Sequence, residues 1–522
     1  MSLVCARSVL LASSKVVGAS LVYSSIYHRL SSTLDSRGVL QSRFVLCEQP
    51  LVIARPLNLR VRDEGKRPIL YRIFRSLLRV GWICAKMLPA LVSFPIVLLS
   101  SRGTGIWWDY VVFVLATSGP TAIKLAQWVG TRPDLFPKTA VGALSRFQTV
   151  SIGEYDLSKT VADLDGIYGP SWRDWLELLD DARLIGSGSI AHVSRGRITS
   201  GPYAGTEVAL KIAHRGVREV VEADLDIMES VSWMVSRVPA LTSLDIPEAA
   251  KEFGKFMRSQ TNLLTEADNI NRFTVFFRDT PDVKFPRVLH EYCTRDILVE
   301  TFERGIPLGQ IIDQGSVKLR KKACDLGVGA FLKMLFVDNF VHGDLHPGNV
   351  MFQPSGDETD FAHVNFAKNP QGNLLIIDCG LIAQLGPRDE RNFLDLMHAV
   401  ITGRSKEVGR LMIERSRSHP DTVYRPMEFC DKVAKLVDTT VTGKSLIFGA
   451  VEFGAVITQL LNIARQHKVR LETDFVSVAC ALIVLEGVGK QLDPRRNLLW
   501  EAEPYIVRQF LRRAKGMVVK PL

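Results

Sequence analysis

The segment HGDLHPGN at residues 342–349, followed by DCG at residues 378–380, decides the fold of this 522-residue chain. Phosphoryl transfer of the kinase type needs one carboxylate near the nucleophile, and an Asn and a second Asp to hold metal ions. Asp344 and Asn349 have the spacing of a kinase catalytic loop, and Asp378 stands where the second metal carboxylate belongs. A lone D-x-x-x-x-N carries little weight, so the interpretation depends on the motifs upstream.

Two motifs upstream supply the parts that would hold a nucleotide. Residues 184–193, LIGSGSIAHV, are typical of two strands joined by a turn, with glycines where backbone must approach phosphates, although an ordinary hairpin often has such a sequence. Residues 207–211, EVALK, then alternate as a half-buried strand that directs its last side chain toward a site. The predicted nucleotide-binding residues are Gly186, Ser187, Gly188, Ser189, Val193 and Lys211.

A kinase-like site also needs a helical carboxylate that pairs with Lys211 and orients it. We choose Glu266, because residues 263–273 carry a single apolar stripe at helical spacing. Asp268 is the second choice. The alternative is an ordinary surface helix whose charges have no part in a site.

Taken together, these motifs and the pair Lys124-x-x-Gln127 resemble the UbiB-type atypical kinases, also called aarF-domain-containing kinases, and are most similar to the mitochondrial aarF-domain-containing kinase 2 group. The resemblance runs from about residue 119 to about residue 497. Its most specific part is the His-Pro-Gly after Asp344, because conventional protein kinases carry a Lys two residues after that Asp. It implies an α+β, two-lobed protein-kinase-like fold with a helical N-terminal extension over the active site and a mostly helical large lobe.

The motifs and the resemblance together assign roles within such a site. ATP and Mg²⁺ are the expected cofactors, with Lys211 on the α- and β-phosphates and Asp344 as the catalytic carboxylate. Asn349 and Asp378 are expected to bind Mg²⁺. The resemblance implies that Lys124 and Gln127 act as a gate over the active site, while His342 and His346 are expected to brace the catalytic loop.

The chain also departs from the family pattern. The Lys-x-Gly-Gln hallmark has Ala126 in place of its Gly, and the family's Glu-x-Asp pair falls on Gln260 and Asn262. Two amides in place of two carboxylates should change how Lys124 is held. Cys379 stands where kinases usually have Phe.

Composition describes a globular chain, since 47% of its residues are hydrophobic and 23% charged. Of the net charge of +10, residues 1–80 contribute +9, with thirteen Lys or Arg against four Asp or Glu. No interleaving of aromatic and basic residues occurs there, so nucleic acid is not an expected partner. The eight cysteines are dispersed without a CxxC, which disfavours a disulfide framework and a zinc site.

The first 34 residues are basic, rich in Ser and free of acidic residues until Asp35, which is typical of a mitochondrial presequence. A secretory signal is the main rival, but the basic residues are spread out and no A-x-A site follows. We therefore predict a mitochondrial targeting segment at residues 1–35. Residues 36–105 form a basic linker with a candidate membrane segment at 81–100, long enough for a hydrocarbon core of ~30 Å. A helix buried against the kinase-like body is the alternative for that segment.

The remaining expected parts are a helical extension at residues 106–180, a small lobe at 181–305 and a large helical lobe at 306–522. A polar stretch at 353–372 is predicted to be an insertion in the hairpin between Asn349 and Asp378. No Ala-Pro-Glu follows residue 380, and an apolar helical pattern begins soon afterwards. A platform that grips a peptide is therefore not expected.

The sequence thus predicts a kinase-like ATP-binding protein that acts as an ATPase or as a small-molecule or lipid kinase. The resemblance ties it to coenzyme Q (ubiquinone) or lipid metabolism, with the mitochondrial membrane, a lipid or quinone precursor, and a ubiquinone-biosynthesis complex as expected partners. A pseudokinase-like scaffold or lipid-binding chaperone that uses nucleotide as a switch is the alternative, and a conventional protein kinase is a third.

Overall fold

The computed structural model describes ten stretches of the chain, all within residues 50–522. They are residues 69–97, 101–132, 135–136, 138–149, 157–179, 186–237, 246–354, 371–416, 423–439 and 453–514. The predicted targeting segment 1–35 and most of the predicted insertion, 355–370, lie outside them.

An antiparallel sheet forms the small lobe, in the order β1-β3-β4-β6 with β2 paired to β3. Its strands are β1 (Leu176–Leu178), β2 (Gly186–Ser187), β3 (Ala191–Ile198), β4 (Glu207–Ala213) and β6 (Ile297–Thr301). In β4, Val208 and Leu210 are fully buried against one face of the sheet. Because side chains alternate along a strand, Ala209 and Lys211 point to the opposite face, where the cavity lies.

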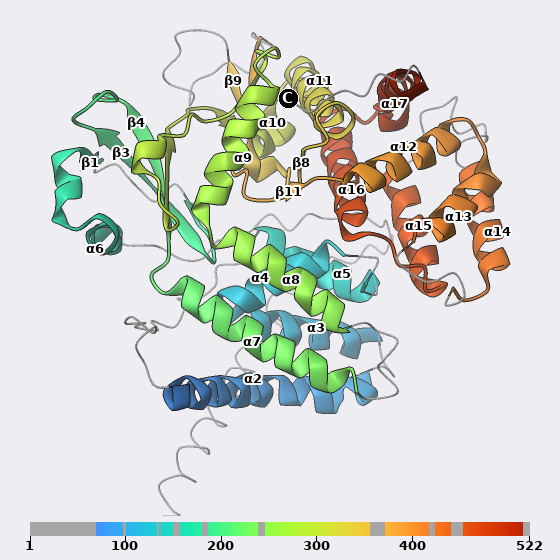
Figure 1. The fold of residues 1–522 in the computed structure, drawn as a ribbon, viewed down its shortest axis with the longest axis horizontal. Coiled ribbons are helices and arrows are strands. Elements are labelled where there is room, and N and C mark those ends of the chain that lie inside the picture. The colour runs from blue at the N-terminus through green and yellow to red at the C-terminus, as the bar shows by residue number, and fades with distance from the viewer. Residues whose placement is uncertain are drawn as a thin grey trace, which may run out of the picture. The chain divides into compact units, whose positions relative to one another are not determined.

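Helices cover both faces of this sheet (Figure 1). On the outer face, Leu164 of α6 (Leu157–Tyr168) and Trp172 of η3 (Pro170–Asp174) close a small apolar core against β4. On the other side lies α9 (Leu263–Phe276), which packs against β6. Helices α7 (Val217–Val235) and α8 (Ile246–Gln260) run from the end of the sheet toward the N-terminal helices. The short elements β5 (Val283–Lys284) and η5 (His290–Tyr292) precede β6.

The N-terminal helices are α2 (Ile69–Val97), α3 (Ser101–Ala116), α4 (Pro120–Gly130) and α5 (Lys138–Leu144), followed by η2 (Ser145–Thr149). Helix α4 docks on α8, where the rings of Trp128 and Phe253 have centroids 5.6 Å apart. Arg132 at the end of α4 also pairs with Glu252 of α8 at 3.1 Å. The extension is therefore joined to the small lobe by buried contacts.

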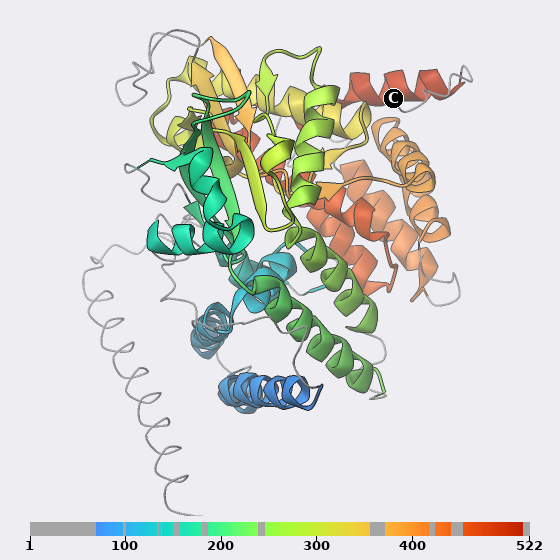
Figure 2. The same cartoon turned by 60° about the vertical axis from the view of Figure 1, so that its left-hand side comes forward.

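Helix α2 packs against α3 and α7, on the side of them away from the sheets (Figures 1 and 2). Two of its charged side chains face the protein: Arg79 bonds to Asp224 of α7, and Lys86 Nζ donates to Thr117 Oγ1 at 2.9 Å. The described part of the expected segment 81–100 therefore docks on the body while much of its surface stays exposed, and residues 98–100 lie outside the description.

The large lobe begins with α10 (Leu308–Gln314) and the long α11 (Val317–Phe336). A short strand, β7 (Ile306–Pro307), comes directly before α10. After α11, the motifs at 342–349 and 378–380 lie on and between the short strands β8 (Val341–His342), β9 (Val350–Pro354), β10 (Gly372–Ile376) and β11 (Ile382–Ala383), with η6 (Pro347–Asn349) between β8 and β9. Strands β9 and β10 pair antiparallel, so the predicted hairpin joins the motifs that contain Asn349 and Asp378.

The rest of the described chain is helical, and α12 begins at Pro387, seven residues after the DCG motif. These helices are α12 (Pro387–Ile401), α13 (Ser405–Glu414), α14 (Pro426–Val437), α15 (Phe453–Gln466), α16 (Thr473–Leu492) and α17 (Leu498–Ala514). Among the described residues, one stretch, Asp474–Leu492 in α16, is long and apolar enough to cross a membrane, but half of it is buried and it packs on α11 and α15. It is therefore a core helix of the lobe.

Candidate active site

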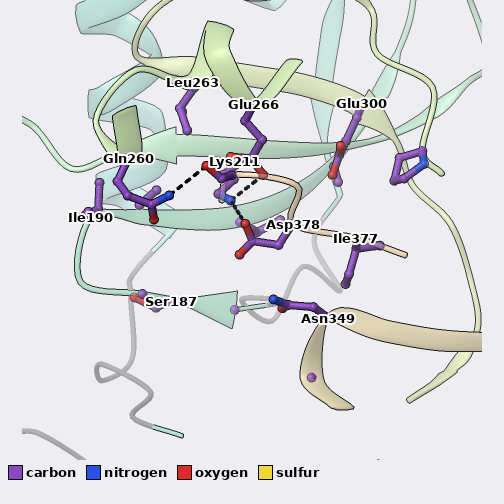
Figure 3. Close-up of a pocket in the computed structure, with 18 of the residues that line it drawn as sticks. Ser187, Ile190, Lys211, Gln260, Leu263, Glu266, Glu300, Asn349, Ile377 and Asp378 are labelled. Atoms are coloured by element: carbon purple, nitrogen blue, oxygen red, sulfur yellow. Dashed lines mark hydrogen bonds and ion pairs between the residues drawn. The ribbon is translucent and has the colours of Figure 1, made fainter. Parts of the chain in front are cut away.

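A cavity of about 340 Å³ lies between the sheet of the small lobe and the strands of the large lobe (Figure 3). Most of the residues predicted from sequence meet there. Those that line it are Lys124, Gly186, Ser187, Gly188, Ser189, Val193, Lys211, Glu266, Asn349 and Asp378. Asp344 and Gln127 are not among its lining residues.

The Gly-rich turn closes one wall of the cavity. Gly186 pairs with Val193 across β2 and β3, and Gly188 N donates to Ala191 O at 2.8 Å, so the turn between the strands is tight. Ser189 Oγ is buried without a hydrogen-bond partner among the described residues. A buried hydroxyl without a partner is costly, and a phosphate oxygen at this turn would satisfy it.

Lys211 lies between two carboxylates at the centre of the cavity (Figure 3). Its Nζ donates to Glu266 Oε1 at 2.8 Å and to Asp378 Oδ1 at 3.0 Å. Glu266 comes from α9, and its side chain is only 6% exposed. The helical carboxylate chosen from sequence is thus the one that contacts Lys211, and the second choice, Asp268, has no such contact among the described residues.

The charges of this triad depend on one another. Burial would lower the pKa of Lys211, but the charges of Asp378 and Glu266 outweigh it and raise that pKa, so the ammonium stays charged. Burial raises the pKa of Glu266 to about 7, and the ammonium of Lys211 limits the rise. Burial would also raise the pKa of Asp378, yet the charge and hydrogen bond of Lys211 lower it. Asp378 is therefore a persistent anion at the cavity.

Two residues could hold Mg²⁺, which prefers oxygen ligands and keeps sites for water and phosphate oxygens. Asp378 supplies an ionised carboxylate and has the left-handed backbone conformation, with φ of 56°. Asn349 Nδ2 donates to Asp344 O at 3.0 Å, which leaves the amide oxygen as its ligand atom. Across the described stretches, no group of three or more His, Cys, Asp or Glu could hold a metal alone. The residues fit Mg²⁺ completed by phosphate oxygens.

His342 braces the catalytic loop, as predicted for it. The histidine is fully buried, and its Nδ1 accepts a hydrogen bond from Asp344 N at 3.2 Å. Its Nε2 must then carry the proton that bonds to Asp378 O at 3.0 Å. Burial lowers the pKa of His342, which favours this neutral form. His346 accepts from Gly348 N at 3.0 Å and so shapes the same loop.

Lys124 enters the cavity from α4. Its Nζ donates to Gln260 Oε1 at 3.4 Å, and Gln260 Nε2 donates in turn to Gly380 O at 3.0 Å. Burial lowers the pKa of Lys124, and the carboxylates of Asp344 and Asp378 only partly oppose it. With an amide at residue 260, Lys124 is held by a hydrogen bond to a neutral group and not by an ion pair with a carboxylate at that position.

Gln127 has a different position from the one expected. Its Nε2 donates to Phe147 O at 2.8 Å, which ties α4 to η2 rather than reaching the cavity. The structure therefore brings Lys124 to the cavity, whereas Gln127 lies away from it and holds the helix that carries Lys124.

Sequence reasoning missed two residues of the site. Asn269 Nδ2 donates to Cys379 O at 3.0 Å and so fixes the DCG segment from α9. Glu300, at the end of β6, lines the cavity with a carboxyl group that has no counterpart in the predicted motifs. Only its place in an otherwise apolar strand, ILVET, could have singled it out.

These features define a kinase-like nucleotide fold, and comparison with known proteins identifies the family. Residues 166–412 match the model of the ABC1 atypical kinase-like domain, and residues 445–497 that of the UbiB helical domain. A mitochondrial ABC1 family protein of Saccharomyces cerevisiae is 31% identical to the chain, over 85% of the chain and 76% of that protein. The chain therefore belongs to the UbiB/ABC1 family of atypical kinases.

Two other relatives show similar coverage. The probable serine/threonine-protein kinase abkC of Dictyostelium discoideum is 28% identical over 85% of the chain and 70% of that protein. The probable protein kinase UbiB of Yersinia pestis is 28% identical over 76% of the chain and 70% of its own length. A solved Mycobacterium tuberculosis protein, in complex with erythromycin, overlaps 71% of the chain and 87% of its own at 20% identity, with a TM-score of 0.48. The family match confirms the α+β kinase-like fold with N-terminal helices and a mostly helical C-terminal region.

Proposed function

We propose that the chain binds ATP with Mg²⁺ in this cavity and uses it as an ATPase or as a small-molecule or lipid kinase. The observation that carries the proposal is Lys211, held at 2.8 Å from Glu266 and 3.0 Å from Asp378 beside the Gly-rich turn. This is the arrangement that kinase-type phosphoryl transfer uses to place phosphates and metal. Asp344, whose side chain is half exposed, is then the carboxylate available to the acceptor.

Binding and phosphate release test this proposal. A thermal-shift titration of the full chain with Mg-ATP should stabilise it, and Asp378→Asn should abolish the Mg²⁺-dependent part because an amide lacks the charge. Asn tolerates the left-handed conformation at this position, so the fold should survive. An undiminished shift in the variant would remove Asp378 from the metal site. Binding without any phosphate release, with or without vesicles carrying quinone precursors, would favour the nucleotide-switched scaffold.

We further propose that this activity serves coenzyme Q or lipid metabolism in mitochondria, with a lipid or quinone precursor as acceptor and a ubiquinone-biosynthesis complex as partner. Support comes from the basic, acid-free start of the chain, from relatives named as mitochondrial, and from the resemblance to the mitochondrial aarF-domain-containing kinase 2 group. The acceptor is tested by incubating the protein with labelled ATP and prenylated quinone precursors. Transfer of label only to water would support an ATPase activity and contradict the lipid-kinase activity.

The outward face of α2 suggests how the protein meets a membrane. Leu78, Leu88 and Val92 are 57–66% exposed and lie on a different side of the helix from Arg79 and Lys86, whose side chains bond to α7 and Thr117. Trp82, 38% exposed, lies beside them with its ring against the Lys86 ammonium. Apolar residues outside and charged residues inside reverse the usual order of a surface helix. The excess of basic residues before residue 80 complements an anionic lipid surface. We propose that α2 lies on the membrane through this face.

Vesicle flotation tests that arrangement. The full chain should float with vesicles of phosphatidylcholine and anionic phospholipid, and Leu88→Glu should reduce the bound fraction. Met427→Glu, on the exposed face of α14, is the matched control and should bind as the wild type does. Equal loss in both variants would show that the effect is not specific to α2.

A further inference from the structure

Glu300 lines one end of the cavity. The proposed phosphate chemistry assigns no role to this end. In the ladder between β4 and β6, Glu300 faces Ala209, two residues from the position opposite Lys211. Val299 is buried in the apolar core on the outer face of the sheet, so Glu300 points to the cavity face. Figure 3 shows its carboxyl group directed into the cavity, away from Gln260 and the Gly-rich turn.

This carboxyl group has no internal partner. Glu300 Oε2 is buried and makes no hydrogen bond to any of the described residues, whereas the nearby Glu266 is paired with Lys211. Native proteins seldom bury a polar atom in this way, because the lost hydration is not replaced. A buried polar atom that opens on a ligand cavity is satisfied when the ligand is bound.

The surroundings of Glu300 favour its neutral form. Burial raises its pKa to about 8, and the carboxylates of Glu266, Asp378 and Glu303 add to the rise while Lys211 opposes it. A protonated carboxyl group offers one O–H donor and one carbonyl acceptor side by side, whereas the ionised group offers acceptors only.

The cavity beside Glu300 suits a flat aromatic group. Val193 and Ala209 line it from the small lobe, and Met351 and Ile377 line it from the large lobe. Lys211, Asp378 and the Gly-rich turn mark the end where phosphates would lie. A nucleotide placed with its phosphates there has its base between these four apolar side chains, with one edge toward Glu300.

We propose that the Glu300 side chain reads the base of the bound nucleotide, accepting from the 6-amino group of adenine and donating to the neighbouring ring nitrogen. Adenine presents this donor and acceptor pair on either edge of its amino group, and the carboxylic acid is its complement. The inference rests on the proposed function, because it assumes that the cavity binds a nucleoside triphosphate. It makes Glu300 a specificity-determining residue that the motif-based assignment of the site does not include.

Competition binding against a ribose-labelled fluorescent ATP analogue tests the proposal with the full chain. The competitors are ATP and purine riboside triphosphate, which lacks only the 6-amino group. The wild type should prefer ATP by about ten- to hundredfold, the range expected when a buried acceptor loses its donor. Glu300→Gln keeps a donor and an acceptor and should keep most of that preference. Glu300→Met keeps the volume but neither polar atom, and should bind the two competitors within about twofold.

A pH series on the wild type gives a second test that needs no variant. The preference for ATP should rise as pH rises through about 8. Both competitors then lose the donor to the ring nitrogen, while the ionised carboxylate accepts more strongly from the 6-amino group that only ATP carries. In Glu300→Gln the preference should not change over the same range. Since both competitors carry the same triphosphate, the ratio cancels the titration of Glu266, Asp378 and Lys211.

The outcomes separate this inference from the proposed function. If Glu300→Met still prefers ATP as strongly as the wild type, or if the preference is absent in a wild type that binds ATP, Glu300 does not read the base. If the wild type binds neither triphosphate, the proposed nucleotide function fails first. Lys211→Ala should lower the affinity for both competitors by the same factor. An equal loss indicates that phosphate contacts, and not base recognition, have been removed.

Discussion

Replacing Lys211 by Met leaves a buried carboxylate without its cation, and the result should depend on pH. Met has similar length and no charge, so the change removes the 2.8 Å contact with Glu266 while largely filling the space. Removing one partner of a buried ion pair typically costs about 3–5 kcal/mol. Glu266 can avoid this cost by taking up a proton, because burial already raises its pKa to about 7 in the presence of Lys211.

The free energy needed to protonate Glu266 is an upper limit on the stability lost in Lys211→Met, and it can be calculated at each pH. From the ordinary Glu value of 4.5, protonating Glu266 costs about 1.4 kcal/mol at a pH of about 5.5 and about 5 kcal/mol at a pH of about 8. In the variant the folded-state pKa of Glu266 lies above the unfolded value. Its contribution to stability is then fully present below the unfolded pKa and is lost as pH rises through the folded one. The variant should therefore be close to wild type in acid and weakest in base.

Urea denaturation without nucleotide, at pH near 5.5 and near 8, measures the difference. The double variant Lys211→Met with Glu266→Gln should recover most of the loss at the higher pH, because the amide needs no proton. Arg410→Met, which breaks an exposed pair with Glu414, is the control and should have little effect at either pH. An equal loss for Lys211→Met at both pH values would refute the reasoning, since it would mean that Glu266 is not the group left unpaired.

Three further outcomes are expected. Lys124→Ala should preserve or tighten ATP binding while changing hydrolysis, unlike Lys211→Ala, which should lose affinity; a Lys124 variant identical to wild type in both binding and turnover would end the gating hypothesis. Gln260→Glu should lower stability by about 1–3 kcal/mol, because a carboxylate cannot donate to Gly380 O, and thermal unfolding measures this. Residues 1–35 fused to a fluorescent protein should carry it into mitochondria, and cytosolic or secretory fluorescence would contradict the prediction.

The core of the site could be predicted because its chemistry constrains sequence locally. The residues predicted to hold phosphate or metal lie in short motifs with fixed spacing, so Lys211, Asn349 and Asp378 could be placed together at the cavity without coordinates. Glu266 could also be selected, because the apolar stripe of its helix shows which face is buried. Each of these residues is identified from neighbours that lie only a few positions away in the sequence.

The parts that could not be predicted depend on contacts between distant segments. Glu300 lies in a strand whose sequence is ordinary, and only the pairing of β6 with β4 turns it toward the cavity. Gln127 follows Lys124 by one helical turn, yet the packing of α4 on η2 sends the two side chains to different partners. Residues 81–100 are apolar enough to be read as a membrane segment from sequence, and only the contacts of α2 with α3 and α7 show which side of that helix faces the protein.

The amide at residue 260 shows how a single departure from the family pattern changes the electrostatics of the site. A carboxylate there could accept from Lys124, but it would repel the carbonyl of Gly380 and add a charge beside Asp378. The amide makes both hydrogen bonds, at 3.4 Å to Lys124 and 3.0 Å to Gly380 O, without adding a charge. With no carboxylate partner, the pKa of Lys124 is lowered by burial. Lys124 is therefore held at the cavity by a weak contact to a neutral side chain.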